Sequence, residues 1–411
     1  MSEITPDRKL NSDNLRVFEF GIPARVPIIE ENLLINTRTP WVWYGISNMA
    51  PQELIRLYNS SPTHRACIQS KWFGVRGESL IVAPENQSRI VMVNSLGDTL
   101  YDLWMKTALD FILYGGFALN IVWRKDRDLG FEMYYMDYSK LRAAKSDTYD
   151  RIHHYYYCPD WEAYKRPEYK PRKLQAFDPN GEDNSQVFYY TTHSAGNNYY
   201  PTPSYWGSAT AISTEIEVYN WWYNNICNGL NPSLWVALSP VPGPEEREAI
   251  YQNLSGKYGG SNNSGKLFLT FSDNKDQQPL VQPIQPNSSD KQFLEMGEAV
   301  QQAILTSHQI SSPELLGIQT PGRLGSADHL EAQDHFNHLV IRPLQEEIKV
   351  VFEKLLLLRD KTPIKLEIQQ FKMVTTPDKA PIETVDVNKV EDVGVQKEEV
   401  INDTENINPN E

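Results

Sequence analysis

Residues 259–271 read GGSNNSGKLFLTF, and Gly260–Lys266 fits all but the last position of the pattern G-x-x-x-x-G-K-S/T. In that pattern backbone N–H groups cradle phosphates, the lysine reaches them and the final hydroxyl ligates Mg²⁺. Leu267 stands where that hydroxyl is needed. A phosphate-binding loop also follows a strand and opens a helix, whereas this sequence predicts a helix before the loop and a strand, KLFLTF, after it. We therefore expect a connecting turn, with nucleotide binding as an alternative.

No other group of residues has the spacing of a catalytic or metal site. His329, His335 and His338 fall on one predicted helix, but they lack the i, i+4 pair of H-E-x-x-H. There is no G-x-S-x-G, and no serine or cysteine stands beside an evident base. The three cysteines are far apart and form no C-x-x-C motif. The chain is expected to be neither an enzyme nor a metal or cofactor binder.

Aromatic residues make up 11% of the chain and include Trp221–Trp222 and the run YYY at 155–157. Clustered aromatic rings can form a sugar-binding platform, although buried cores and subunit contacts are commoner explanations. A carbohydrate-binding protein is therefore a second alternative.

The formal net charge is -14, and residues 377–411 carry ten acidic and three basic side chains. This balance argues against a protein that holds nucleic acid on a broad basic surface, but it permits contact with DNA that must slide. The N-terminus has no apolar signal core, and no run reaches the roughly 18 apolar residues of a membrane helix. We expect a protein made in the cytoplasm, without a membrane partner.

Hydrophobic periodicity predicts a mixed unit in the first half of the chain, after an extended, proline-containing arm over 1–50. Two helices are expected on either side of Ser61–Pro62, and a longer helix should stop at Gly115–Gly116. A loop of low hydrophobicity is expected near 160–186. The predicted strands are 79–82, 117–123, 131–136, 153–158 and 186–192.

Two long helices, 208–228 and 289–308, bracket a small insert in the second half. The insert should contain strands at 233–239 and 266–271, a helix at 245–258 and an extended run near 279–286. A glycine- and proline-rich loop at 317–325 precedes a helix over 326–358, which Pro343 should kink near 339–343. A strand at 363–371 and a disordered acidic tail complete the chain.

This order of elements resembles the portal proteins of tailed bacteriophages, in particular the family common in long-tailed phages. The resemblance covers about residues 55–372. It rests on SPTHRACIQS, DFILYGGFALNIVW, PTPSYWGSATAISTEIEVYNWWYNNICNGLNPSLWVAL, YGGSNNSGKLFLTF, DKQFLEMGEAVQQAILTSHQISSPELLG and LVIRPLQEEIKVVFEKLL, taken in that order.

The resemblance implies an α+β portal fold whose subunits form a ring around a central channel. Its parts would be a wing at 51–205, stem helices at 206–229 and 288–310, a clip at 230–287, a tunnel-loop region at 311–327, and a kinked helix with a wing strand at 328–372. The family usually places a helical crown after that strand. Residues 373–411 offer only an acidic tail, so the crown is expected to be small or absent.

The function implied by the resemblance is a DNA channel at one capsid vertex, formed by a ring of about twelve subunits. The terminase large subunit would drive double-stranded DNA in without sequence specificity, a head–tail adaptor would close the ring, and DNA would leave toward the tail. The major capsid protein would surround the ring. The expected location is the virion, after assembly in the cytoplasm of a bacterial host.

The same resemblance assigns the candidate site residues. The tunnel loop would place Gln319, Thr320, Pro321, Gly322 and Arg323 at the channel, where copies of Arg323 would form one charged ring. The clip residues expected to contact the motor or the adaptor are Glu245, Glu246, Arg247, Lys257 and Lys266.

Overall fold

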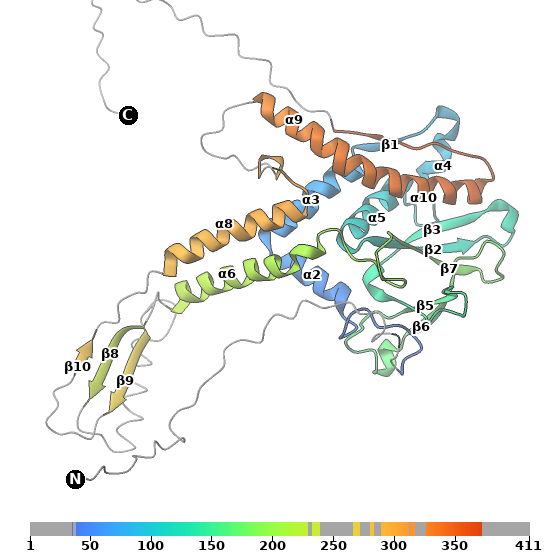
Figure 1. Ribbon diagram of the computed structural model, residues 1–411. Helices are drawn as coiled ribbons and strands as arrows, with labels where there is room; N and C mark the ends of the chain where they lie inside the picture. Colours follow the sequence, from blue (N-terminus) through green and yellow to red (C-terminus); the bar gives the residue numbers. More distant parts are fainter. Residues whose placement is uncertain are drawn as a thin grey trace, which may run out of the picture. The chain divides into compact units, whose positions relative to one another are not determined.

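The computed structural model of the chain is shown in Figure 1. It describes residues 35, 38–228, 232–238, 266–271, 280–282, 289–311, 313–316 and 326–371. The acidic segment 373–411 lies outside these residues. The expectations that it is disordered and that the crown is small or absent therefore stay predictions. The same holds for the predicted clip helix at 245–258.

A six-stranded sheet is the main β structure, with strand order β3-β2-β7-β6-β5-β4. All neighbours are antiparallel except β6 and β7, which run parallel. Four of the predicted strands belong to this sheet and are confirmed, whereas β4 and β6 were not predicted. The strands are β2 (Gly116–Trp123), β3 (Phe131–Met136), β4 (Leu141–Ala143), β5 (His154–Tyr157), β6 (Arg172–Ala176) and β7 (Ser185–Thr191).

Strand β6 lies inside the segment that we expected to be a loop. Its sequence RKLQA is mostly polar, and Arg172 and Lys173 are exposed. Its strand conformation comes from pairing with β5 and β7 on either side. Such tertiary pairing overrides a weak local preference for strand.

Helices α2 (Ala50–Ser60) and α3 (Pro62–Arg76) are separated at Ser61, as predicted. A short helix, α4 (Gln87–Val91), precedes α5 (Leu100–Tyr114). Strand β1 (Ser79–Ile81) pairs antiparallel with β11 (Glu367–Gln369), which is shorter than the strand expected at 363–371. Five 3-10 turns lie at Pro84–Asn86, Arg127–Leu129, Tyr138–Lys140, Pro167–Tyr169 and Trp206–Ser208.

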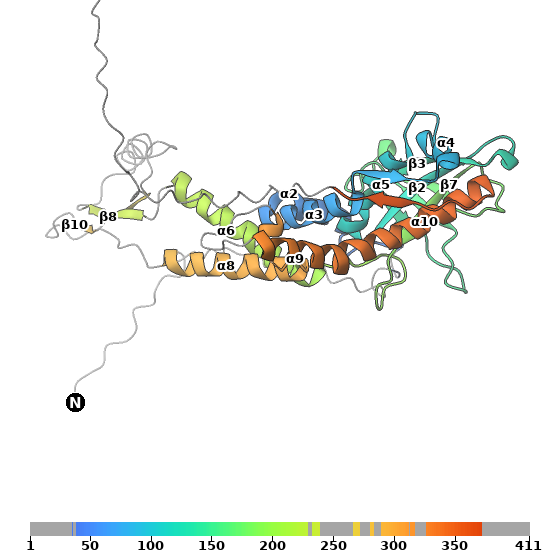
Figure 2. The ribbon, with the colours of Figure 1, turned by 90° about the horizontal axis from the view of Figure 1, so that it is seen from above.

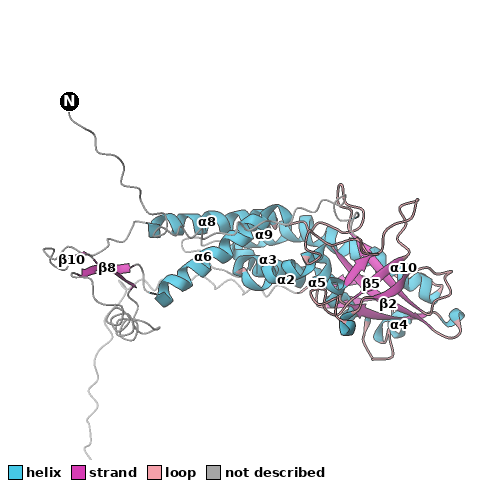
Figure 3. Cartoon of the chain, turned by 90° about the horizontal axis from the view of Figure 1, so that it is seen from below, coloured by secondary structure: helices cyan, strands magenta, loops and turns pink. Residues whose placement is uncertain are grey.

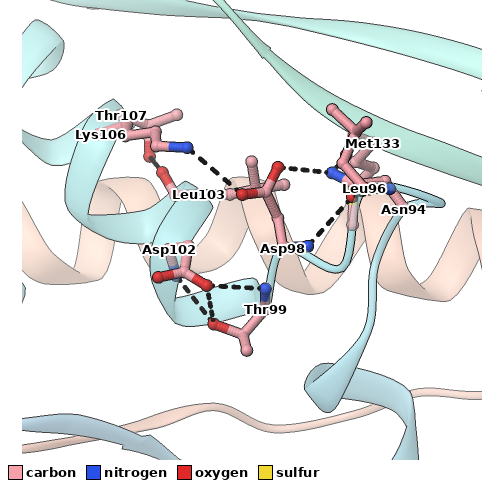
Figure 4. A network of polar contacts seen from close by, with 9 residues as sticks. All are labelled: Asn94, Leu96, Asp98, Thr99, Asp102, Leu103, Lys106, Thr107 and Met133. Atoms are coloured by element: carbon pink, nitrogen blue, oxygen red, sulfur yellow. Dashed lines mark hydrogen bonds and ion pairs between the residues drawn. The ribbon is translucent and has the colours of Figure 1, made fainter.

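Local interactions fix both ends of α5, and Figure 4 shows those at its N-terminal end. The Thr99 hydroxyl accepts from the Asp102 N–H, and the Asp102 carboxylate accepts from the Thr99 N–H at 2.8 Å, forming a capping box. At the other end Gly115 has φ +83°, a left-handed conformation that glycine adopts without a Cβ clash. The predicted stop at Gly115–Gly116 is confirmed, and Gly116 begins β2.

The helix predicted over 326–358 is interrupted where we expected a kink. Helix α9 (Ser326–Phe336) passes through a π-helical turn, Asn337–Ile341, into α10 (Arg342–Asp360). Pro343 lies in the first turn of α10. Because proline has no N–H to donate to the preceding turn, the hydrogen-bond ladder changes its spacing just before it.

Helices α6 (Ala209–Asn228) and α8 (Ser289–Ser307) pack side by side (Figures 1 and 2). Between them in sequence lies a three-stranded sheet with order β10-β8-β9. Its strands are β8 (Pro232–Leu238), β9 (Lys266–Phe271) and β10 (Leu280–Gln282). A 3-10 turn, Pro313–Leu316, follows α8. The two helices and the three strands were expected near these positions.

Figure 3 shows the six-stranded sheet and the helices beside it as a ribbon. One hydrophobic core joins this sheet to these helices. Phe352 of α10 contacts Trp104 of α5 and Phe117 of β2, with ring centroids 5.8 and 5.9 Å apart. The same core contains Ile212 of α6 and Ile304 of α8. The first half of α6 and the last half of α8 are therefore packed into the sheet-containing unit.

The expected boundary of the N-terminal arm at residue 50 is wrong. Val42 and Tyr44 are buried in the main core, and the Val42 N–H donates to the Ala143 carbonyl at 2.9 Å. Tyr44 also stacks on Tyr200 with a centroid distance of 4.0 Å. The proline content suggested an arm, but these partners are about 100 or more residues away in sequence and supply the packing.

Arg142 anchors this early segment from a fully buried position. Its guanidinium donates to the Asn48 side chain at 2.9 Å and to the Asn48 carbonyl at 2.7 Å. It also donates to the carbonyls of Ser139 and Leu141, and it lies over the Trp161 ring. No carboxylate among the described residues forms an ion pair with it.

We expect Arg142→Met to lower the free energy of unfolding by about 2–4 kcal/mol, because it leaves buried carbonyl groups without donors. Urea denaturation followed by fluorescence would measure this loss. Arg151→Met, at an exposed position nearby, is the matched control and should change the stability by less than about 0.5 kcal/mol. Equal loss in the two variants would contradict an anchoring role for Arg142.

Candidate functional site

The residues assigned to the tunnel loop and clip are largely outside the described part of the chain. Gln319, Thr320, Pro321, Gly322 and Arg323 all fall in this category, as do Glu245, Glu246, Arg247 and Lys257. Lys266 is described only as the first residue of β9. Their roles therefore stay predictions, and the structure informs us about the elements that carry them.

Elements before and after the segment 317–325, the turn at Pro313–Leu316 and helix α10, contact α3. On one side, the Ser70 hydroxyl of α3 donates to the Leu315 carbonyl at 3.3 Å. On the other side, the Gln345 side chain of α10 donates to the carbonyls of Gly74 and Val75 at 2.9 and 3.3 Å.

Gly74 of α3 allows the π-helical turn Asn337–Ile341 to approach α3 closely. A Cβ at this position would lie 2.8 Å from Cδ1 of Ile341, which is too near for a real side chain. Ile341 is the last residue of the π-helical turn and is buried against α3. The interruption before Pro343 therefore docks on α3 at a position where only glycine fits without a shift.

A buried polar junction joins α3 to α6. Ser61 is the N-cap of α3, where its hydroxyl accepts from the His64 N–H at 3.1 Å. The Glu215 carboxylate of α6 accepts from the hydroxyls of Ser61 and Thr63, and Glu215 is only 3% exposed. A carboxylate beside the first turn of a helix is also favoured by the helix dipole.

A histidine pair joins α3 to the C-terminal end of α8. Nδ1 of His64 and Nε2 of His308 are 2.9 Å apart, and both residues are fully buried. One imidazole donates and the other accepts, so the contact requires at least one neutral ring. The Tyr205 ring stacks on His308 with a centroid distance of 5.1 Å and also contacts His64. We call Ser61, Thr63, His64, Glu215 and His308 the junction.

Burial keeps both imidazoles uncharged at neutral pH. Desolvation, with a smaller contribution from the Lys71 ammonium, lowers the pKa of His64 to about 3. Desolvation also lowers the pKa of His308 well below its ordinary value, again assisted by Lys71. In the same region burial lowers the pKa of Lys71 to about 8 and raises the pKa of the Cys67 thiol to about 12. The two histidines of the junction are therefore uncharged groups that hold the helices together. Cys67 is a thiol at neutral pH and is not a nucleophilic thiolate.

Nothing in the described residues resembles a metal or membrane site. No group of three or more potential ligands is close enough to hold a metal ion. No described helix is both long and apolar enough to cross a bilayer. Lys266 opens a strand, as the sequence predicted, whereas a nucleotide-binding loop would open a helix there.

The junction was not predicted from the sequence. His64 and His308 are 244 residues apart, and neither belongs to a motif. The one available signal was Ser61 before Pro62, which marks a helix start and therefore a side chain near an N-terminal turn.

Comparison with known proteins finds the fold in gene transfer agent (GTA) particles. A chain in the neck of the empty GTA particle, computed with C6 symmetry, aligns with a TM-score of 0.54 and 17% identity, over 83% of this chain and 89% of that one. A chain in the neck of the native particle, computed with C12 symmetry, gives 0.55 and 17%, over 82% and 88%.

An HK97-family phage portal protein from Corynebacterium diphtheriae aligns over 75% of this chain and 93% of that one, at 11% identity. Its TM-score of 0.45 is too low to support a shared fold by itself. No family model and no curated protein sequence matches the chain. The chain therefore has an α+β fold shared, over most of both lengths, with a chain found in GTA necks.

We expect the protein to lose stability in acid, because His64 and His308 have lower pKa values in the folded chain than in the unfolded chain. The unfolded chain takes up protons at these histidines near pH 6.5, whereas folded His64 resists protonation down to about pH 3. The histidine contribution is thus complete above pH 6.5 and falls with pH through that window. Below pH 6.5, each of the two imidazoles lowers the free energy of unfolding by about 1.4 kcal/mol for each pH unit.

Urea midpoints measured across this window should therefore decline less steeply for His308→Phe than for the unsubstituted protein. His335→Gln, which removes an exposed imidazole, is the control and should keep the original slope. Parallel slopes in all three proteins would show that the buried pair does not govern the acid response.

Proposed function

We propose that the chain is a portal protein, which forms a ring-shaped DNA channel at one vertex of a phage-like capsid. The observation that carries the proposal is the fold shared with neck chains of GTA particles over 82–83% of this chain. One of those necks was computed with C12 symmetry. A ring of twelve subunits is therefore the assembly we propose here.

The exposed aromatic and apolar residues of the helix pair support a ring. The halves of α6 and α8 near the core are buried, but Tyr219, Tyr223 and Met296 toward the other ends are 38%, 68% and 37% exposed. Subunit interfaces are enriched in tyrosine and methionine. In the proposed ring, these halves of the stem contact neighbouring stems.

The charges of the same helices support a conduit for DNA. Helices α6 and α8 contain a single lysine or arginine, Lys291, against five acidic side chains, at positions 215, 217, 290, 295 and 298. Each lysine or arginine that neutralises a phosphate adds affinity and would hold the DNA in place. A stem nearly free of cations lets DNA slide.

The remaining assignments follow from the same proposal. The six-stranded unit and α2–α5 form the wing, α6 and α8 the stem, the β8–β10 region the clip, and 317–325 the tunnel loop. The clip would meet the terminase large subunit during packaging and a head–tail adaptor afterwards, with the major capsid protein around the wing. The protein has no catalytic role, acts in the virion and assembles in the host cytoplasm.

The alternatives have less support. The strand at Lys266 removes the geometry of a nucleotide-binding loop. None of the aromatic residues considered for a sugar platform is fully exposed: Tyr155 is buried, and Tyr156, Tyr157, Trp221 and Trp222 are half-buried.

Negative-stain imaging of the purified chain tests the proposal. We expect rings with a central hole, and a native mass close to twelve times 47.3 kDa. Coexpression with the matching capsid and terminase proteins covers the case in which assembly needs partners. A uniform monomer under both conditions would overturn the proposal.

Arg323→Ala tests the tunnel loop separately. If copies of Arg323 form one charged ring, their loss should change the fraction of packaged DNA that particles retain, because the channel then lacks its only ring of cations from this loop. DNA retention in purified particles is the measurement. Arg342→Ala, an exposed arginine on α10, is the control. Unchanged packaging and retention for Arg323→Ala would remove this role from the loop.

A further inference from the structure

The segment 165–173 of the wing is strongly basic although the chain as a whole is acidic. It reads KRPEYKPRK, with five cations and one carboxylate, Glu168. It runs from the turn before β6 into the first two residues of that strand. Its basic side chains are all exposed, at Lys165, Arg166, Lys170, Arg172 and Lys173. We call these five residues the basic segment.

The positive charge of the basic segment is not neutralised within the described part of the molecule. None of its side chains forms an ion pair there. Tyrosine rings support two of them: the Arg172 guanidinium lies 5.1 Å from the Tyr157 ring centroid, and the Lys165 ammonium lies 5.9 Å from that of Tyr164. Cation–π contacts position a cation but leave its charge in place.

The stretch of sequence around the basic segment indicates what it can bind. Residues 150–218 contain no large exposed hydrophobic side chain, although Ile46, in a segment that packs against Tyr164 and Tyr169, is exposed. A protein partner is usually held by apolar anchors at the centre of its interface. The backbone of a nucleic acid needs only cations and hydrogen-bond donors. The pattern of charge without apolar anchors fits a nucleic acid.

We propose that the basic segment binds the phosphate backbone of double-stranded DNA without sequence specificity. This goes beyond the proposed conduit function, because it concerns the wing rather than the stem or the tunnel loop. The nearly cation-free stem would leave DNA mobile, whereas the basic segment would provide weak, salt-dependent contact at a separate place. Nonspecific binding of this kind typically has dissociation constants of about 10⁻⁴–10⁻⁶ M.

The test compares two variants of the full-length protein that remove equal charge. One combines Lys170→Gln, Arg172→Gln and Lys173→Gln. The control combines Lys125→Gln, Arg342→Gln and Lys354→Gln, which are also exposed positions. Binding of a fluorescent DNA duplex of mixed sequence is measured by anisotropy over a series of salt concentrations, and circular dichroism checks that both variants fold.

We expect the first variant to bind about tenfold or more weakly, equally for duplexes of different sequence. The slope of log K against log salt should fall by about one for each phosphate that the variant no longer neutralises, and the control should match the unsubstituted protein. Equal weakening in both variants, or no weakening in either, would overturn the proposal. Tighter binding of labelled polyglutamate than of DNA would also overturn it, since the surface would then suit acidic polypeptides. The outcome of this binding experiment does not bear on whether the chain forms rings, so imaging tests the portal proposal separately.

Discussion

The buried junction between α3, α6 and α8 holds the helix pair α6 and α8 against the unit that contains the six-stranded sheet. A buried carboxylate or imidazole without hydrogen-bond partners costs several kcal/mol, so these helices are strongly favoured to pack where the partners meet. Glu215 reaches the hydroxyls of Ser61 and Thr63, and His64 meets His308 in the same region. Apolar contacts alone would tolerate a small slide of one helix along another. The polar pairs disfavour such a slide, because it would separate their hydrogen-bonding atoms.

The two ends of the helix pair α6 and α8 differ in their burial. Near the junction, Ile212, Ile304 and Leu305 belong to the main hydrophobic core. Further along, Tyr219 and Met296 are exposed in the isolated chain. Burying such side chains would stabilise contact with other subunits by about 25 cal/mol for each Å² of apolar surface. Within one chain, packing holds α6 and α8 at the end near the junction. In the proposed ring, neighbouring subunits contact the exposed residues at the other end.

Local signals in the sequence predicted most of the elements, whereas contacts distant in sequence determined the rest. Gly115 and Pro343 mark a helix end and a helix interruption because their backbone chemistry acts within one turn. By contrast, the strand β6 depends on its neighbours, and the packing of Val42 and Tyr44 depends on residues near 143 and 200. His64 and His308 carry no motif, so their pairing follows only from the fold. The shared fold with GTA neck chains agrees with the resemblance noted from element order, since order and length are the features that local patterns record best.

The distribution of charge is as informative as its total. A net charge of -14 argued against a broad basic surface for nucleic acid, yet the sum hides two opposite regions. Helices α6 and α8 hold almost no cations, while the five cations of the basic segment lie within nine residues. Electrostatic attraction between exposed charges is largely screened beyond about 8 Å at physiological salt, so each region acts on what lies next to it. In the two proposals, the nearly cation-free helices leave DNA free to slide and the basic segment binds DNA weakly. Because screening limits the range of each charge, neither effect cancels the other.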